Sequence, residues 1–349
     1  MIDVHVHLRD WEQSNKETLA HGMGVALSCG VDEVFDMPNT NPPLTGRTAI
    51  LKRFEDAQAC NLAVCYHLWA GVTSDRTQLS EMVALHRELF PRVIGLKMFA
   101  GHSTGNMGLT EEETQKQVYH TLAHADYRGV LALHCEKESL LRPNLERNED
   151  FSSHSLARPV EAEVASVRDQ LRFALEAGFK GHLHICHLSS IETLSVIEDA
   201  RAAGVRVSCG VTPHHALLSQ DDAKDRSLYA KMNPPLRSET ERSALFAALL
   251  AGRIDWIETD HAPHTLADKE GGASGIPGFS GMLLLLKALI EAGAQEDLLL
   301  DLVGKRALRV FGLSDRVITI PLYDELASRS LEAAKAYPFD SFANFRLRW

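Results

Sequence analysis

The stretch Asp3-Val4-His5-Val6-His7-Leu8-Arg9 carries two histidines two residues apart in an apolar, β-branched run. Such a run is typical of a buried strand, in which alternate side chains point to the same face. The imidazoles of His5 and His7 should therefore converge on one point, as metal ligands do. The alternative is that one histidine packs in the core while the other meets solvent. Four later strand-like runs end in a further candidate ligand or anchor, which favours the metal site. These are Lys97, His134, His187 and Asp260.

Short β-branched runs alternate with amphipathic helical patterns along most of the chain. The predicted strands are Ile2–His7, Glu33–Met37, Ala63–Trp69, Val93–Phe99, Val130–His134, His182–His187, Val205–Cys209 and Ile254–Asp260. The predicted helices are Thr18–Ser28, Arg47–Gln58, Gln78–Leu89, Glu111–Ala125, Pro159–Ala177, Ile191–Ala203, Glu239–Leu250 and Gly281–Ala292. This alternation predicts an α/β fold, a (β/α)8 TIM barrel spanning residues 1–312. A doubly wound sheet is the alternative, but the glycine-rich turn it would normally carry after its first strand is missing.

The candidate ligands all fall at the C-terminal ends of predicted strands, where barrel enzymes place their chemistry. Neutral imidazoles and carboxylate oxygens are the usual ligands of catalytic zinc. His5, His7 and Asp260 could hold one ion, and His134 with His187 a second. Two neighbouring ions need bridging oxygen ligands, and a free lysine is a poor candidate because its ammonium would be repelled.

Composition excludes several classes of function. The chain has 349 residues, of which 45% are hydrophobic, and a formal net charge of -11. This acidic balance, without a basic patch interleaved with aromatic residues, argues against nucleic-acid binding. The sequence opens on the His-x-His strand without a signal peptide, and no apolar run could span a bilayer. The six cysteines form no C-x-x-C pair, which is typical of reduced thiols. We therefore expect a cytoplasmic protein without a membrane partner.

Seven motifs extend this pattern through the barrel. They are Asp3-Val4-His5-Val6-His7-Leu8-Arg9, Met37-Pro38-Asn39-Thr40, Gly95-Leu96-Lys97-Met98-Phe99, His134-Cys135-Glu136, His184-Ile185-Cys186-His187-Leu188-Ser189, Lys231-Met232-Asn233-Pro234-Pro235-Leu236-Arg237 and Thr259-Asp260-His261-Ala262-Pro263-His264. Together they resemble the cyclic amidohydrolases, and the dihydroorotases most closely. Members usually carry a small β-sandwich beside the barrel, which we expect to be missing or reduced here. For residues 313–349 we expect a C-terminal extension, with a strand at Val317–Tyr323 and a surface helix at Ala327–Tyr337.

The resemblance implies a metal-dependent, reversible hydrolysis of L-dihydroorotate to N-carbamoyl-L-aspartate. It implies two Zn²⁺ ions, bridged by Lys97 after its reaction with carbon dioxide to a carbamate. Asp260 would be both a metal ligand and the catalytic acid and base. The glycine-rich run Gly101–Gly108 would form a mobile flap over the small-molecule substrate.

Further residues match the family's substrate contacts. Arg9, Asn39 and His264 would hold the substrate carboxylate, and Asn233, Pro277 and Gly278 would contact the ring. A hydantoinase or allantoinase is the nearest alternative, but its substrates lack the ring carboxylate that Arg9 would bind. A non-catalytic scaffold is a second alternative, although such proteins tend to lose ligands and this chain keeps them. The sequence is compatible with a homo-oligomer and does not fix the number of subunits.

Overall fold

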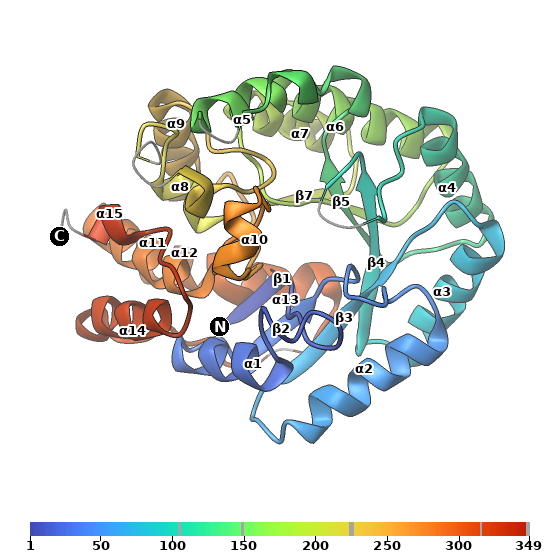
Figure 1. Ribbon diagram of the computed structural model, residues 1–349. Helices are drawn as coiled ribbons and strands as arrows, with labels where there is room; N and C mark the ends of the chain where they lie inside the picture. Colours follow the sequence, from blue (N-terminus) through green and yellow to red (C-terminus); the bar gives the residue numbers. More distant parts are fainter. Residues whose placement is uncertain (104–105, 148–149, 223–226, 315, 347–349) are drawn as a thin grey trace.

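The structure is a computed structural model that describes residues 1–103, 106–147, 150–222, 227–314 and 316–346. Eight parallel strands form one sheet in sequence order, with the helices around its outer face (Figure 1). The predicted (β/α)8 barrel is confirmed. The strands are β1 (Ile2–Val6), β2 (Glu33–Asp36), β3 (Cys65–Gly71), β4 (Val93–Ala100), β5 (Val130–Cys135), β6 (His182–Ile185), β7 (Val207–Val211) and β8 (Trp256–Ile257).

The barrel closes beyond the end of its last strand. β8 is shorter than the predicted Ile254–Asp260, and the contact with β1 is made by the segment that follows it. Val6 and His261 form a parallel bridge, and the amide of His7 donates to the His261 carbonyl at 2.7 Å. This closure brings the histidines of β1 next to Asp260.

Eight longer helices cover the sheet, close to their predicted positions. They are α1 (Leu19–Ser28), α2 (Arg47–Ala59), α3 (Arg76–Leu89), α4 (Glu112–His124), α6 (Val160–Glu176), α7 (Ile191–Ala202), α9 (Glu239–Leu250) and α11 (Phe279–Glu291). Shorter helices that the sequence pattern did not predict fill the connections. They are η1 (Glu138–Leu140), η2 (Pro143–Leu145), α5 (Phe151–Ala157), α8 (Pro213–Leu217), η3 (Ser227–Ala230), α10 (Leu266–Glu270), α12 (Glu296–Leu300), η4 (Asp301–Lys305), α13 (Arg306–Phe311) and α15 (Ala343–Arg346).

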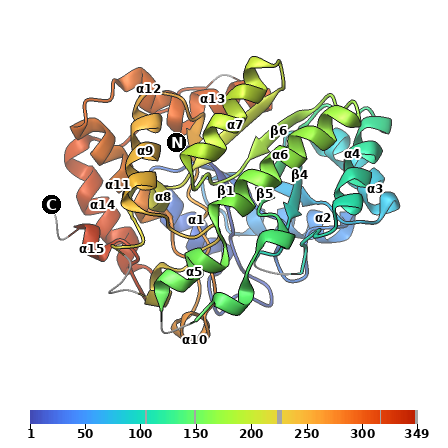
Figure 2. The same cartoon turned by 90° about the horizontal axis from the view of Figure 1, so that it is seen from above.

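Aromatic side chains fill the barrel end that carries the strand N-termini. Phe311 of α13 packs against Phe35, Trp69 and Trp256, with ring centroids 5.0, 5.6 and 5.8 Å away. Figure 2 shows α12 and α13 at this end, and α5 and α10 at the opposite one. Because this end is filled, substrate access is left to the end where the strands finish.

The segment after Gly312 differs from expectation. Val317–Tyr323 is not a strand: residues 317–322 form no regular secondary structure, and α14 (Tyr323–Lys335) begins at Tyr323. The predicted surface helix corresponds to α14, which packs one face along α11 and leaves its other face exposed. A Cβ atom on Gly281 would lie only 2.3 Å from the ring of Phe342, which is too close for two carbon atoms. Helix α11 therefore needs glycine there.

Every strand among the described residues belongs to the barrel sheet. The end of α13 falls next to the predicted boundary after residue 312, which stays a prediction. None of the described helices is long and apolar enough to cross a lipid bilayer.

Candidate active site

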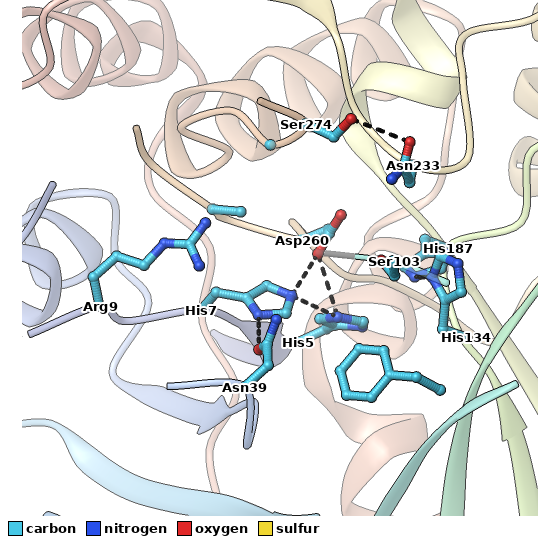
Figure 3. A pocket seen from close by; sticks show the side chains of 13 residues that line it. His5, His7, Arg9, Asn39, Ser103, His134, His187, Asn233, Asp260 and Ser274 are labelled. Atoms are coloured by element: carbon cyan, nitrogen blue, oxygen red, sulfur yellow. Dashed lines mark hydrogen bonds and ion pairs between the residues drawn. The ribbon is translucent and has the colours of Figure 1, made fainter. Parts of the chain in front are cut away.

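The candidate ligands meet at the C-terminal end of the barrel (Figure 3). His5 and His134 lie in β1 and β5, whereas His7, His187 and Asp260 follow the ends of β1, β6 and β8. His187 and Asp260 have φ angles of 38° and 48°. Side chains other than glycine adopt this left-handed region at a cost, and such residues cluster at functional sites. The backbone at both residues therefore turns to direct a side chain into the barrel mouth.

His5, His7 and Asp260 form the first ligand group. His7 Nε2 lies 3.2 Å from His5 Nε2 and 2.9 Å from Asp260 Oδ1, and His5 Nε2 lies 3.3 Å from the same oxygen. A tetrahedral site with bonds of about 2.0–2.1 Å has edges of about 3.3 Å. The three atoms are thus spaced as the ligands of one zinc ion would be.

A contact behind His7 directs its ring. His7 Nδ1 lies 2.6 Å from Asn39 Oδ1, and an amide oxygen can only accept. His7 therefore donates from Nδ1 and presents the lone pair of Nε2 to Asp260 and His5. Burial lowers the pKa of His7 to about 4, so the ring is neutral, as a ligand must be.

His134 and His187 form the second group, with His134 Nδ1 3.2 Å from His187 Nε2. His134 Nε2 lies 2.9 Å from Glu136 Oε2, and Arg158 donates to the same carboxylate. Burial alone would raise the pKa of Glu136, but Arg158 and His134 hold it well below its usual range. The ionised Glu136 accepts from Nε2 and leaves the Nδ1 lone pair of His134 directed at His187. Such an outer carboxylate commonly orients a metal-binding histidine.

The charge states of the candidate ligands suit a bound cation. Burial lowers the pKa of His134 and holds that of His187 well below its usual range, so both rings are neutral. Burial alone would raise the pKa of Asp260, but His7 and His5 hold it well below its usual range. The neutral nitrogens of His7, His134 and His187, with an ionised carboxylate, are donors suited to a divalent ion. Burial alone would lower the pKa of His5, but Cys186 and Glu258 raise it to about 10, so His5 would give up a proton on binding the ion.

Lys97 reaches the same region from β4. Its side chain is fully buried, and its ammonium donates to Cys186 Sγ at 3.2 Å and lies 4.9 Å from the centroid of the Phe99 ring. Neither partner is a carboxylate. A buried ammonium without a carboxylate partner carries a large desolvation cost. Lys97 is not among the residues that line the cavity, and its role and its modification stay predictions.

A cationic wall faces the histidines. Arg9 is buried, its Nε donates to the Pro263 carbonyl at 3.2 Å, and its Nη2 lies 3.2 Å from His264 Nε2. Lys16 Nζ lies 3.4 Å from His264 Nδ1. Burial, with Arg9 and Lys16 nearby, lowers the pKa of His264 to about 3. The positive charge at this wall is therefore carried by Arg9 and Lys16.

Some of the other predicted substrate contacts line the cavity, and others do not. The cavity is lined by Asn39 and Asn233 as expected, and Ser274 donates to Asn233 Oδ1 at 3.2 Å. Pro277 and Gly278 lie outside its lining, which is formed here by Ser274 and Gly275 instead. The amide of Gly278 donates to His261 Nδ1 at 3.0 Å, so that backbone group serves the structure.

The glycine-rich flap meets the cavity through Ser103, which lines it together with Phe99. Residues 104 and 105 of the predicted Gly101–Gly108 flap lie outside the described residues. Gly101 has a φ of 136°, and a Cβ there would lie 2.0 Å from the Glu136 carbonyl oxygen, so the loop must begin with glycine. Its predicted mobility remains untested.

The loop that carries Asp260 is held from behind by His261. Its Nε2 lies 3.0 Å from Glu17 Oε1, and the Tyr337 hydroxyl donates to the same oxygen at 2.6 Å. All three side chains are largely buried. Tyr337 follows α14, so residues beyond the barrel support the residue next to Asp260.

Two carboxylates near the ligands were not among the predicted site residues. Glu136 stands two residues after His134, so the alternation of β5 could have indicated it. Glu258 stands two residues before Asp260 and accepts from His184 Nε2 at 2.9 Å. His184 is thus packed against a carboxylate.

No protein-family model matches the chain. It is 36% identical over 318 residues to a dihydroorotase of Halobacterium salinarum, covering 90% of this chain and 71% of the relative. A dihydroorotase of Lactiplantibacillus plantarum is 35% identical over 322 residues, with 90% and 72% covered. Among solved structures, L-hydantoinase from Arthrobacter aurescens is similar, with a TM-score of 0.82, 24% identity, and 92% and 72% of the two chains covered. The last similarity shows the fold, and those to the curated proteins show that this chain is a cyclic amidohydrolase of the dihydroorotase family.

Proposed function

We propose that this enzyme interconverts L-dihydroorotate and N-carbamoyl-L-aspartate by hydrolysis and closure of the ring amide. The observation that carries the substrate assignment is the buried Arg9 guanidinium, beside the histidine cluster and in the cavity wall. A guanidinium fork suits a carboxylate in two-point contact. The substrates of a hydantoinase or allantoinase have no ring carboxylate to occupy this wall.

Two zinc ions fit the donor set. His5, His7 and Asp260 would hold one, and His134 with His187 the other, because their ligand atoms lie within 3.3 Å of one another in each group. When bound, two such ions lower the pKa of water and polarise an amide carbonyl.

Lys97 would supply the bridging oxygens. Its unprotonated Nζ would attack the carbon of carbon dioxide, forming an N–C bond and releasing one proton, and the product is an anionic carbamate. The full burial of Lys97 and the absence of a carboxylate among its two contacts support this, because an anion there removes the cost of a buried ammonium.

Asp260 would move the proton. Its carboxylate is ionised and reaches the first ligand group through Oδ1, so it can accept a proton from the attacking water. The carboxylate would then donate that proton to the ring nitrogen as the amide bond breaks. In the reverse direction it would take the proton from the ureido nitrogen that closes the ring.

Arg9, with Asn39 and His264 beside it, would orient the substrate through its carboxylate. Holding that group fixes the scissile amide at one distance from the ligand groups, which lowers the entropic part of the barrier. Asn233 and Ser274, across the cavity, would contact the ring. The flap at Ser103 would limit the access of water when it closes.

The test is a substrate comparison with the zinc-loaded enzyme. We expect hydrolysis of dihydroorotate and cyclisation of carbamoyl aspartate, with hydantoin and allantoin turned over far more slowly. Faster turnover of hydantoin would contradict the assignment, and a fully metal-loaded protein that turns over none of them would support the scaffold alternative.

All six cysteines are free, which supports a cytoplasmic location.

A further inference from the structure

A separate group of possible metal ligands lies at the end of the barrel away from the cavity. Glu33 and Cys65 are the first residues of β2 and β3, and they pair with each other in the register of the two strands. His67 follows Cys65 by two residues, on the same face of β3. One ligand atom from each of these three side chains lies within 4.8 Å of the other two. We call the three side chains the basal group.

The basal group faces the interior of the barrel. Phe35, two residues after Glu33, belongs to the aromatic cluster that fills this end. Trp69, two residues after His67, belongs to the same cluster. The side chains of His67 and Glu33 are exposed by only 5 and 3%, whereas Cys65 is an exposed residue. The group is therefore buried at its imidazole and carboxylate and open to solvent at its thiol.

A hydrogen bond behind His67 fixes which of its ring nitrogens carries the lone pair. Nδ1 lies 2.7 Å from the Pro91 carbonyl oxygen, which can only accept. Nδ1 therefore donates, and a neutral His67 has its lone pair on Nε2. That nitrogen lies 2.7 Å from Glu33 Oε1 and 3.2 Å from Cys65 Sγ. His67 thus directs its lone pair at a carboxylate oxygen and a sulfur.

Two lone pairs at this distance repel each other unless positive charge lies between them. Nε2 and Oε1 therefore need either a shared proton or a cation. A cation would also use the sulfur, which a shared proton leaves out. Imidazole nitrogen, thiolate sulfur and carboxylate oxygen are all zinc ligands. The nitrogen and oxygen ligands of one zinc ion lie about 3.3 Å apart, so binding would widen the contact between His67 and Glu33 by roughly 0.6 Å.

The surroundings leave one carboxylate oxygen and one open side for an ion. Arg316 pairs with Glu33 Oε2, so Oε1 is the oxygen that faces His67. With the thiol ionised, one carboxylate and one thiolate outnumber this single guanidinium, and negative charge remains for a divalent ion. The Cys65 amide donates to the Asp32 carbonyl at 2.8 Å, which holds the start of β3 against the start of β2. Water could complete the coordination from the exposed side of the thiol.

We propose that Glu33 Oε1, Cys65 Sγ and His67 Nε2 bind one divalent cation of the zinc type. Binding would release the thiol proton and any proton shared by His67 and Glu33. The ion would join β2 to β3 at the opposite end of the barrel from the candidate active site, so it would stabilise the barrel and take no part in hydrolysis. The site goes beyond the proposed function and depends on no substrate. Its rival is the shared proton alone, with Cys65 as an uninvolved thiol.

Alkylation of the intact protein with iodoacetamide separates these two possibilities, with each modified cysteine identified by peptide mass spectrometry. A metal-bound sulfur is a poor nucleophile, so zinc should slow the alkylation of Cys65 by about tenfold or more. Cys60 is the internal control, because it is partly buried and its Sγ donates to the Asp56 carbonyl outside the basal group. Zinc should leave its rate unchanged. Alkylation of Cys65 at the same rate with and without zinc would overturn the site.

Glu33→Gln tests whether the ion needs the carboxylate as well as the sulfur. Glutamine keeps the size of the side chain, and its amide can donate to His67 Nε2 in place of the shared proton. The zinc concentration that protects half of Cys65 should rise roughly tenfold in this variant. An unchanged concentration would mean that zinc binds the exposed thiol alone, which would refute a site of three ligands.

Cys65→Ser tests the stoichiometry and the stabilising role. The zinc-loaded variant should hold one metal equivalent fewer than the wild type, and zinc should raise its Tm by less. Cys60→Ser is the matched control and should keep the wild-type metal content and Tm. Equal metal content in Cys65→Ser and the wild type would contradict the proposal. Hydrolysis of dihydroorotate should be unchanged in both variants, so these results are independent of the substrate test.

Discussion

Replacing Arg9 by methionine tests the substrate assignment most directly. Methionine keeps much of the buried stem but removes the guanidinium, while His5, His7 and Asp260 keep their contacts. A hydrogen bond to a charged group contributes ~1.5–3 kcal/mol. At about 1.4 kcal/mol per tenfold change, kcat/KM for dihydroorotate should fall roughly 10- to 150-fold. The lost hydrogen bond to the Pro263 carbonyl should lower the free energy of unfolding by only ~0.5–1.5 kcal/mol.

The assay is steady-state hydrolysis of dihydroorotate, with metal content measured on the same samples. Hydantoin, which lacks the carboxylate, is the control substrate, and any slow turnover of it should be the same in both proteins. Arg9→Lys keeps the charge without the fork and should fall between them. The reasoning fails if Arg9→Met hydrolyses dihydroorotate as fast as the wild type, or if both substrates lose activity equally.

Three other predictions concern the metals, the flap and a buried lysine. Lys97→Ala should lose at least one metal ion and nearly all activity, and a variant that keeps two ions with normal turnover would exclude the bridge. Shortening Gly101–Gly108 should reduce turnover with metal content unchanged, and hydrogen exchange in this loop should slow when carbamoyl aspartate binds. Burial lowers the pKa of Lys269 from 10.5 to about 7. Between these values the unfolded chain binds more protons, so stability should rise with pH there, and urea unfolding of Lys269→Met should show a smaller rise.

The barrel could be predicted because its strands are short, apolar and regularly spaced. The prediction failed at Val317–Tyr323, where alternating apolar residues also suggest a strand. A strand needs a neighbour to accept its backbone hydrogen bonds, and the barrel sheet already pairs its eight strands among themselves. Instead Ile318 is buried against Gly304, while Val317 stays 86% exposed. An alternation of apolar residues along the sequence does not show whether a sheet has a free edge with which the segment could pair.

The candidate ligands could be predicted for the same reason as the strands: they stand where strands end. Their orientation could not. His187 and Asp260 take left-handed backbone angles, which histidine and aspartate adopt more often than most residues, but still too rarely for the residue type to predict them. Glu258 was missed because its neighbours His5 and Cys186 come from other strands. Contacts between distant segments depend on barrel registry, which no local pattern contains.

The hydrogen bond between Tyr337 and Glu17 has a consequence for local opening. Since Glu17 also contacts His261, undocking the segment after α14 would leave His261 with a weaker support. Amide exchange at Ala262 and Gly278, both bonded to this loop or to His261, should then speed up together with exchange in α14. In Tyr337→Phe, which removes only one hydroxyl, exchange at Ala262 and Gly278 should depend less on the opening of α14 than it does in the wild type. The segment after α14 would thus control how often the loop that carries Asp260 opens.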